Sequence, residues 1–254
     1  MTKKIVKVNW SGGKDSTCAA HLRILRGEKI KMVCYVPMFT SEIPLLLKDH
    51  YEWILSTANL FRNLGAQVDI VTGMTYFEYV THIAKKGKYK GKMFGFPCYI
   101  TGACGFKRDS KVKALDSIDI GYYDYEDIGI AADEVKRHGQ LSPFKRSILV
   151  EEGITEAEAF EYCKRNNILS PVYKTKKRDG CTLCPNAKDE ERQAWYRDYP
   201  EAVPILMNLQ RIVNIYRPEN KPLRGKKWFI EEIGLDGVEN KGGDKNAERY
   251  DCEL

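Results

Sequence analysis

The segment IVKVNWSGGKDSTCAAHLRIL, residues 5–25, decides the fold that this sequence predicts. Residues 5–9 alternate apolar and polar side chains, which is typical of a β-strand. The glycine-rich run SGGKDS follows at positions 11–16, and residues 17–25 carry a helical apolar pattern that ends at Gly27. Strand, loop and helix in this order predict an α/β domain, with the loop at the carboxyl end of its first strand.

The same alternation continues along the chain. Residues 32–36 and 67–71 predict two further strands, and a helix lies between them. That helix carries its apolar side chains on one stripe, at Leu47, Tyr51, Ile54, Ala58 and Phe61. Because strands that alternate with helices pair in parallel through right-handed crossovers, we expect a doubly wound parallel sheet. Residues 118–122 predict another strand of it.

Composition excludes several classes of protein. The chain has 254 residues, which suits one large α/β domain with an appended region, and 43% of them are hydrophobic, which is ample for a core. No run of eighteen apolar residues predicts a transmembrane helix, and the charged N-terminal stretch is not typical of a signal peptide, so we expect a cytoplasmic protein without a membrane partner. The net charge of +6 permits a nucleic-acid partner without requiring one.

The glycine loop has the chemistry of an anion site. Gly12 and Gly13 let backbone N–H groups approach an anion closely, and the helix that follows points its positive end at it. Lys14 adds a positive charge, whereas Asp15 orients the loop or approaches a magnesium ion. The hydroxyl groups at positions 11 and 16 add donors. A plain glycine turn before a helix is the alternative, but six matching residues between a strand and a helix favour an anion site.

The run SGGKDS resembles the PP-loop of the N-type ATP pyrophosphatases, enzymes that cleave ATP between the α and β phosphates to adenylate an oxygen. The resemblance implies ATP and Mg²⁺ as ligands, with Lys14 and Asp15 as catalytic candidates. It also implies that the whole loop holds pyrophosphate, through Ser11, Gly12, Gly13, Lys14, Asp15 and Ser16.

Further segments are similar to one branch of that superfamily, the phosphoadenosine phosphosulfate (PAPS) reductase-like family. The segment GIAADEVKR, residues 129–137, matches a family motif at Gly129, Ile130, Glu134 and Arg137, and SPVY, residues 170–173, and RDGCTLCP, residues 178–185, match two more. The resemblance implies that Gly129 and Arg137 contact the nucleotide. It also implies that basic residues after the first cysteines face substrate phosphates, here Lys107, Arg108 and Lys111. Neutralisation of thiolate charge and a solvated helix face are the alternatives for these three.

Two departures from that family narrow the range of functions that the resemblance implies. Sulfonucleotide reductases have a degraded glycine loop and a C-terminal ECGLH segment, whereas this chain keeps SGGKDS and ends in YDCEL. We therefore expect an ATP-dependent enzyme that adenylates an acceptor, for sulfur transfer to a nucleic acid or nucleotide, with a sulfur donor protein as a candidate partner. One alternative is a PAPS or adenylylsulfate reductase with Cys252 as the nucleophile. The other is a non-catalytic nucleotide-binding module. A homodimer stays open.

Two cysteine pairs have the makings of a metal site. Cys98 and Cys104 form one pair, and Cys181 and Cys184 form the other. Four thiolates suit a tetrahedral zinc ion or an iron–sulfur cluster, and we favour a four-iron cluster slightly over zinc. Buried apolar thiols, or a redox dithiol at the second pair, are the alternatives. Three other cysteines lie on predicted apolar faces and are expected in the core: Cys18, Cys34 and Cys163.

Three regions follow from these patterns. Thr155 and Glu158 form a capping box that predicts the start of a helix, and two charged helices are expected at residues 188–198 and 202–216. The regions are a PP-loop nucleotide-binding domain at 1–145, a mostly helical region with the CxxC knuckle at 146–234, and a mobile polar tail at 235–254.

Two sets of titratable residues carry no assigned role. The acidic stretch 124–127 is compatible with a magnesium site, although exposed acids near a turn are the commoner arrangement. The histidines at 21, 50, 82 and 138 lie at no metal-ligand spacing from one another, and we assign none of them a catalytic role.

Overall fold

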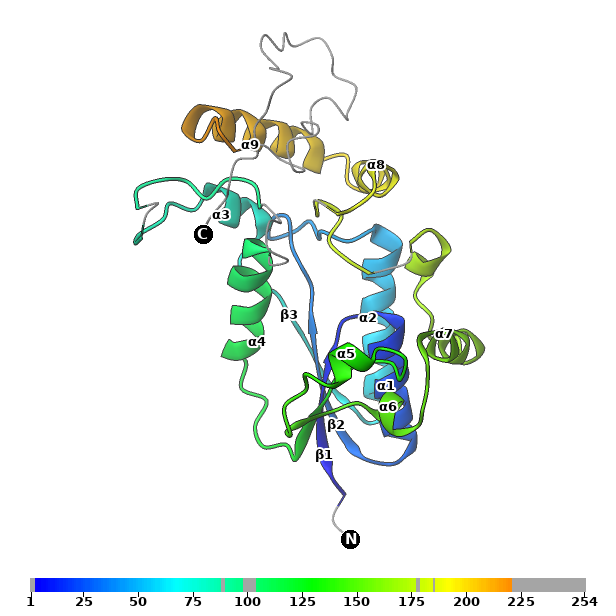
Figure 1. Ribbon diagram of the computed structural model, residues 1–254. Helices are drawn as coiled ribbons and strands as arrows, with labels where there is room; N and C mark the ends of the chain where they lie inside the picture. The colour runs from blue at the N-terminus through cyan, green and yellow to red at the C-terminus, as the bar shows by residue number, and fades with distance from the viewer. Residues whose placement is uncertain (1–2, 88–89, 98–103, 177–178, 185, 221–254) are drawn as a thin grey trace. The chain divides into compact units, whose positions relative to one another are not determined.

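The computed structural model describes residues 3–87, 90–97, 104–176, 179–184 and 186–220 (Figure 1). The expectations for Cys98, for Cys252 and for the tail at 235–254 lie outside these residues. The chain divides into two compact units. The first comprises Met1–Val36, Lys48–Val71 and Ala114–Asp179, and the second comprises Pro37–Leu47, Thr72–Lys113 and Gly180–Leu254.

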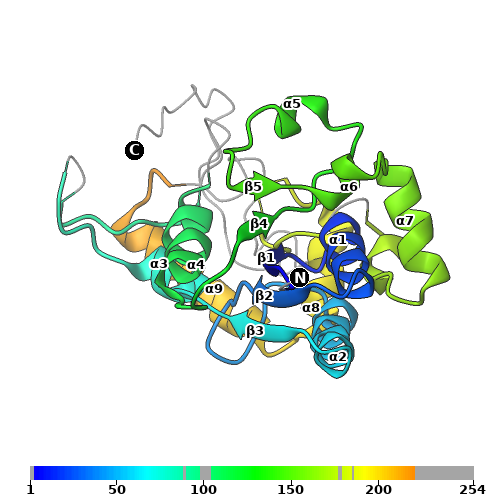
Figure 2. The same cartoon turned by 90° about the horizontal axis from the view of Figure 1, so that it is seen from below.

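A five-stranded parallel sheet forms the centre of the first unit. Its strands are β1 (Ile5–Trp10), β2 (Lys29–Tyr35), β3 (Gln67–Val71), β4 (Tyr125–Asp127) and β5 (Lys145–Arg146). They lie in the order β3-β2-β1-β4-β5, with every pair parallel (Figure 2). The expected α/β fold with a parallel sheet is therefore confirmed, in a Rossmann-like arrangement. The chain winds outward from β1 in both directions, so the switch point lies between β1 and β4.

Helices of the first unit cover the sheet. They are α1 (Lys14–Leu25), α2 (Lys48–Asn63), α4 (Lys113–Ser117), α5 (Val135–His138), α6 (Ile148–Glu151), α7 (Glu156–Arg165) and a 3₁₀ turn at Pro171–Lys174. Helices α1, α2, α6 and α7 lie on the same face of the sheet (Figure 2). Buried Cys18 of α1 and Cys163 of α7 belong to one apolar cluster, and Cys34 is buried in β2, as expected of core cysteines.

A buried ion pair ties α1 to the sheet. Arg23 Nε lies 2.5 Å from an oxygen of Asp127 in β4, and both side chains are buried. A buried carboxylate needs such a partner, because desolvation is costly for an unpaired charge. The expectation of exposed acids at 124–127 is thus wrong for two of its members, since Glu126 and Asp127 are buried within β4.

The expected strand at 118–122 is also wrong. Asp119 accepts a hydrogen bond from Gly121 N at 2.8 Å, and Gly121 has a φ of +64°, which no strand residue adopts. The carbonyls of Ile120 and Tyr122 both accept from Lys31 Nζ. A local turn and a lysine therefore satisfy this backbone, and the strand forms three residues later as β4.

Helices form the regular secondary structure that is described in the second unit. It contains α3 (Tyr76–Thr81), a π-helix at Lys107–Val112, α8 (Asp189–Asp198) and α9 (Ala202–Tyr216). Trp195 of α8 is completely buried in its core, packs edge-on against Phe39, and donates to the Pro44 carbonyl at 2.8 Å. No helix in the described part of the chain is both long and apolar enough to cross a membrane.

Candidate functional site: a glycine loop at the switch point

The SGGKDS loop connects β1 to α1 at the switch point of the sheet. Gly12 has a φ of +77°, and α1 begins at Lys14. Hydroxyl groups hold the loop from within: Ser11 N donates to Ser16 Oγ at 3.1 Å, and Gly13 N donates to Ser11 Oγ at 3.2 Å. These bonds explain why the two serines flank the glycines. The loop lies at the carboxyl edge of the sheet, where parallel α/β folds bind ligands.

Two glycines of the site have no room for a side chain. A Cβ on Gly12 would lie 3.1 Å from Ile54 and 3.2 Å from His50 Cε1, both in α2. Gly129 follows β4, and a Cβ there would lie 2.6 Å from Ser16 Cα and 2.8 Å from the Asp15 carbonyl carbon. Backbone from β4 thus packs directly on the first turn of α1. The expectation that Gly129 contacts the nucleotide stays a prediction, and the structure places this glycine against the loop.

Lys14 is paired with two carboxylates. Its Nζ lies 2.9 Å from both oxygens of Asp15 and 3.2 Å from Glu156 of α7. Burial alone would lower the pKa of Lys14, but the two carboxylates outweigh it and raise that pKa above its ordinary value. Burial likewise raises the pKa of Asp15, although Lys14 opposes the shift. The lysine is therefore a cation held in place, whereas the sequence indicated only a charge near the loop.

Tyr173 completes the loop from a distant segment. Its hydroxyl oxygen accepts a hydrogen bond from Lys14 N at 2.8 Å, and burial raises its pKa well above the ordinary value. The phenol therefore stays protonated and keeps its hydrogen for another acceptor. The family-like segment ending in Tyr173 was the sequence signal for this residue, but the residues alone assigned it no role.

Arg137, which the resemblance implies as a nucleotide contact, has a carboxylate partner in its own segment. It lies on α5 with its side chain 58% exposed, and its guanidinium pairs with Glu134 at 2.5 Å. Glu134 in turn lies close enough to Asp15 to raise the pKa of that carboxyl. Its effect is smaller than those of burial and Glu156, which also raise this pKa, and of Lys14, which lowers it. Of these two motif residues, Glu134 is the one with a described electrostatic effect on the loop.

The basic residues expected at substrate phosphates lie in the second unit, on the π-helix. Arg108 lies 2.7 Å from an oxygen of Asp109, and Lys113 lies 2.7 Å from the other. Asp109 is buried, and the two cations outweigh the burial and lower the pKa of its carboxyl. Lys107 is exposed and Lys111 is half-buried. Arg108 is thus engaged with a carboxylate of its own helix.

Three of the four expected metal-binding cysteines can be placed, all in the second unit. None of these three, Cys104, Cys181 and Cys184, forms a disulfide, and each is partly buried. Burial and then the neighbouring thiols of Cys184 and Cys104 raise the pKa of Cys181 to about 12. Buried Tyr76 lies close to all three thiols, which also raise its pKa after burial. The thiols therefore lie near one another, although their segments are far apart in sequence.

The described residues nevertheless form no group of three His, Cys, Asp or Glu side chains close enough to hold a metal ion. The fourth expected ligand, Cys98, lies outside those residues. The thiols that can be placed do not by themselves fit a zinc ion or an iron–sulfur cluster, so we derive no chemistry through a metal.

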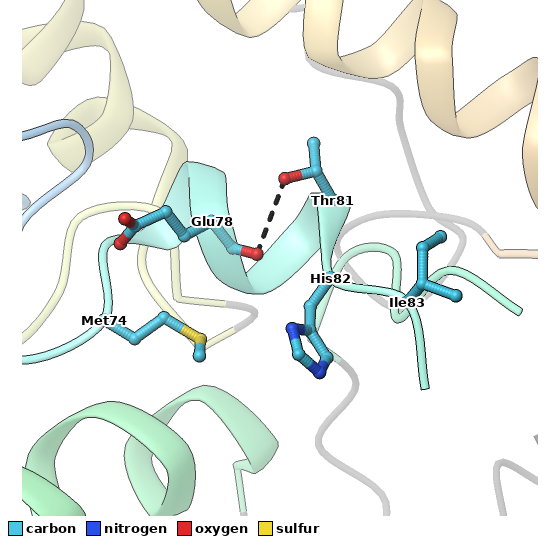
Figure 3. Close-up of a pocket in the computed structure, with 5 residues that line it drawn as sticks. All are labelled: Met74, Glu78, Thr81, His82 and Ile83. Atoms are coloured by element: carbon cyan, nitrogen blue, oxygen red, sulfur yellow. Dashed lines mark hydrogen bonds between the residues drawn. The ribbon is translucent and has the colours of Figure 1, made fainter. Parts of the chain in front are cut away.

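A pocket of about 620 Å³ lies in the second unit, lined by Met74, Glu78, Thr81, His82 and Ile83 (Figure 3). Glu78 accepts from the Thr75 backbone N–H at 2.8 Å and so caps α3, while the His82 ring packs against Phe94. The Glu78 carboxylate and the His82 ring point away from each other (Figure 3). Thr81 Oγ1 donates to the Phe77 carbonyl at 2.8 Å, so each of the three polar lining side chains has a structural partner and the pocket offers no converging chemistry.

The structure therefore defines an α/β protein with a glycine loop at the switch point of a parallel sheet. No family model matches the chain, and no curated protein is significantly similar to it.

Proposed function

We propose that this protein is a PP-loop enzyme of the PAPS reductase-like type. It uses ATP to adenylate an acceptor, a nucleic acid or nucleotide that then receives sulfur. The observation that carries the proposal is the loop at residues 11–16, which includes Lys14 and has Gly129 packed against its backbone. A glycine loop at a helix N-terminus suits a polyphosphate, because backbone N–H groups and the helix dipole favour negative charge there.

The proposed reaction has two steps. An acceptor oxygen attacks the α phosphorus of ATP, the bond to the bridging oxygen of the β phosphate breaks, and pyrophosphate leaves with the electron pair. A sulfur nucleophile from the donor then attacks the carbon that bears the adenylated oxygen, the carbon–oxygen bond breaks, and AMP leaves. The loop residues stabilise the charge that builds up on pyrophosphate, since fixed donors are most effective where charge develops.

Lys14 and Asp15 have distinct roles in this proposal. A triphosphate competes with the half-exposed Glu156 for Lys14 Nζ, since that ion pair is the longer of the two. Asp15, which stays next to the lysine, is the candidate carboxylate for Mg²⁺. One carboxylate together with substrate phosphates is a common way of binding this ion.

The experiment measures the products formed from ATP and Mg²⁺ with sulfide and one of three acceptors: RNA, DNA or free nucleosides. We expect AMP and pyrophosphate in equal amounts with one acceptor, and about a hundredfold lower rate for Lys14→Ala. Lys136→Ala, an exposed lysine on α5, is the matched control and should keep the rate.

Other products identify the alternatives. ADP and phosphate would contradict cleavage between the α and β phosphates. Turnover of PAPS that is lost in Cys252→Ser would support the reductase instead. Tight ATP binding with no turnover for any acceptor would support the binding module.

A further inference from the structure

His50 places an unsatisfied polar atom beside the glycine loop. The residue lies in the first turn of α2 and is 1% exposed. Its Nε2 has no hydrogen-bond partner among the residues that the structure describes. Its Cε1, to which Nε2 is bonded, lies 3.2 Å from the position that a Cβ on Gly12 would occupy. The imidazole ring that carries this nitrogen therefore lies directly beside the part of the loop where the backbone turns.

The hydrogen bonds around His50 are compatible with a proton on Nε2. His50 Nδ1 lies 2.7 Å from Ser170 Oγ, and that oxygen also accepts the Val172 backbone N–H at 3.2 Å. Since Ser170 already accepts from the backbone, its hydroxyl hydrogen is available to donate to Nδ1. A neutral imidazole that accepts at Nδ1 carries its hydrogen at Nε2. In this tautomer His50 presents a buried N–H donor with no acceptor.

Burial keeps this imidazole neutral. Desolvation, and then the nearby positive charge of Lys176, lower the pKa of His50 to about 4. The ring also stacks on Trp53 of the same helix, with the ring centroids 5.9 Å apart and the planes at 15°. Its orientation is therefore determined by the stack on one side and by Ser170 on the other.

The surroundings favour an anionic acceptor. His50 lies at the N-terminal end of α2, where the helix dipole is positive, and the buried Lys176 adds a positive charge on the same side. Buried donors are almost always satisfied in folded proteins, so an unsatisfied one beside a ligand loop calls for a ligand atom. A phosphate oxygen meets both requirements.

We propose that His50 is a nucleotide-binding residue, whose Nε2–H donates a hydrogen bond to a phosphate oxygen of the nucleotide held by the loop. Ser170 is its positioning residue, because it selects the tautomer. This inference rests on the proposed function, and it adds a phosphate contact from α2 to those of the loop.

The test measures the binding of inorganic pyrophosphate and of ATP, each with Mg²⁺, to the full chain by calorimetry. His50→Asn keeps an amide near Nδ1 but cannot reach the position of Nε2, whereas His50→Gln can place its amide nitrogen there. We expect affinity for both ligands to fall about tenfold to a hundredfold in His50→Asn, the range for a hydrogen bond to a charged group. In His50→Gln the loss should stay within about threefold.

His21→Gln is the matched control, because its ring is already bonded to the Tyr162 hydroxyl at 2.8 Å. It should leave both affinities unchanged. A second measurement avoids variants altogether: the ¹⁵N spectrum of histidine-labelled wild-type protein should show a protonated Nε2 for His50 that shifts when pyrophosphate is added. This readout remains decisive if His50→Asn fails to fold.

The outcomes separate the two proposals. If the wild-type chain binds neither ligand, the proposed function fails. If it binds both and His50→Asn binds them equally well, or the Nε2 signal does not move, the role of His50 is wrong and the function stands. If His50→Asn weakens ATP but not pyrophosphate, the contact is to the α phosphate or the nucleoside, and a contact to the pyrophosphate part of the nucleotide is overturned.

Discussion

The glycine loop of the first unit and the cysteine region of the second unit differ in how much of the chain each requires. The loop is held mainly by its own serines, and only single residues such as Gly129 and Tyr173 complete it from elsewhere. The thiols of Cys104 and Cys181 meet only because distant segments pack around Tyr76. Local hydrogen bonds make the first region a site in itself, whereas tertiary packing alone brings the second together.

Replacing Gly129 should disrupt the glycine loop and produce the largest of the expected effects. A Cβ in Gly129→Ala would lie 2.6 Å from Ser16 Cα and 2.8 Å from the Asp15 carbonyl carbon, and this backbone cannot move without distorting the start of α1. We expect a loss of at least about 3 kcal/mol in the free energy of unfolding, a Tm lower by roughly 10 °C, and no detectable ATP binding. Thermal melts and calorimetry measure these quantities.

Gly139→Ala is the control for this prediction. The nearest atom to its added Cβ, the Val135 carbonyl oxygen, lies at an ordinary distance of 3.6 Å. Equal melting temperatures for the two variants would show that the contact of Gly129 with α1 is not essential.

The second prediction concerns pH and His50. Its folded-state pKa of about 4 is below the ordinary value of 6.5, so the unfolded chain binds more protons between these limits. The neutral ring therefore contributes stability that is complete above pH 6.5 and is lost as pH falls toward 4. Two and a half pKa units correspond to up to about 3 kcal/mol. Urea unfolding from pH 7.5 to pH 4 measures this loss.

Comparison with His50→Gln isolates the histidine from the carboxylates that also titrate in this range. The wild-type protein should lose up to about 3 kcal/mol more than the variant over the interval. Parallel curves for the two proteins would mean that His50 is not buried as a neutral ring.

The third prediction concerns the cysteine region of the second unit and has the smallest expected effect. A pKa of about 12 leaves Cys181 about a thousandfold less ionised at pH 8 than a thiol with the ordinary value of 9.0. The higher nucleophilicity of its thiolate recovers part of this, so in metal-free protein we expect alkylation about fiftyfold slower than for an ordinary thiol. Iodoacetamide labelling followed by mass spectrometry gives the rate.

Cys181 in the urea-unfolded chain is the internal reference for that rate. Similar rates in the folded and unfolded protein would show that Cys181 is neither desolvated nor surrounded by other thiols. The packing of Tyr76, Cys104 and Cys181 would then be wrong.

The start of the fold was predictable because its signals are local. Hydrophobic periodicity located β1, β3 and α2, and the capping box of Thr155 and Glu158 located the start of α7. The strand after residue 117 was misplaced because Lys31, distant in sequence, satisfies the carbonyls there. His50 was passed over because a lone histidine on a helix carries no spacing signal, and only its neighbours make it notable.

The sequence by itself determined that a glycine loop links a strand to a helix and has the chemistry of an anion site. It did so because alternation, glycine flexibility and helix capping act over a few neighbouring residues. Only the tertiary structure decided what surrounds that loop: Gly129 against its backbone, Lys14 between two carboxylates, and the unsatisfied nitrogen of His50 beside Gly12. These features depend on which distant segments pack together, and burial alters the charge and hydrogen bonding of each group only once they do.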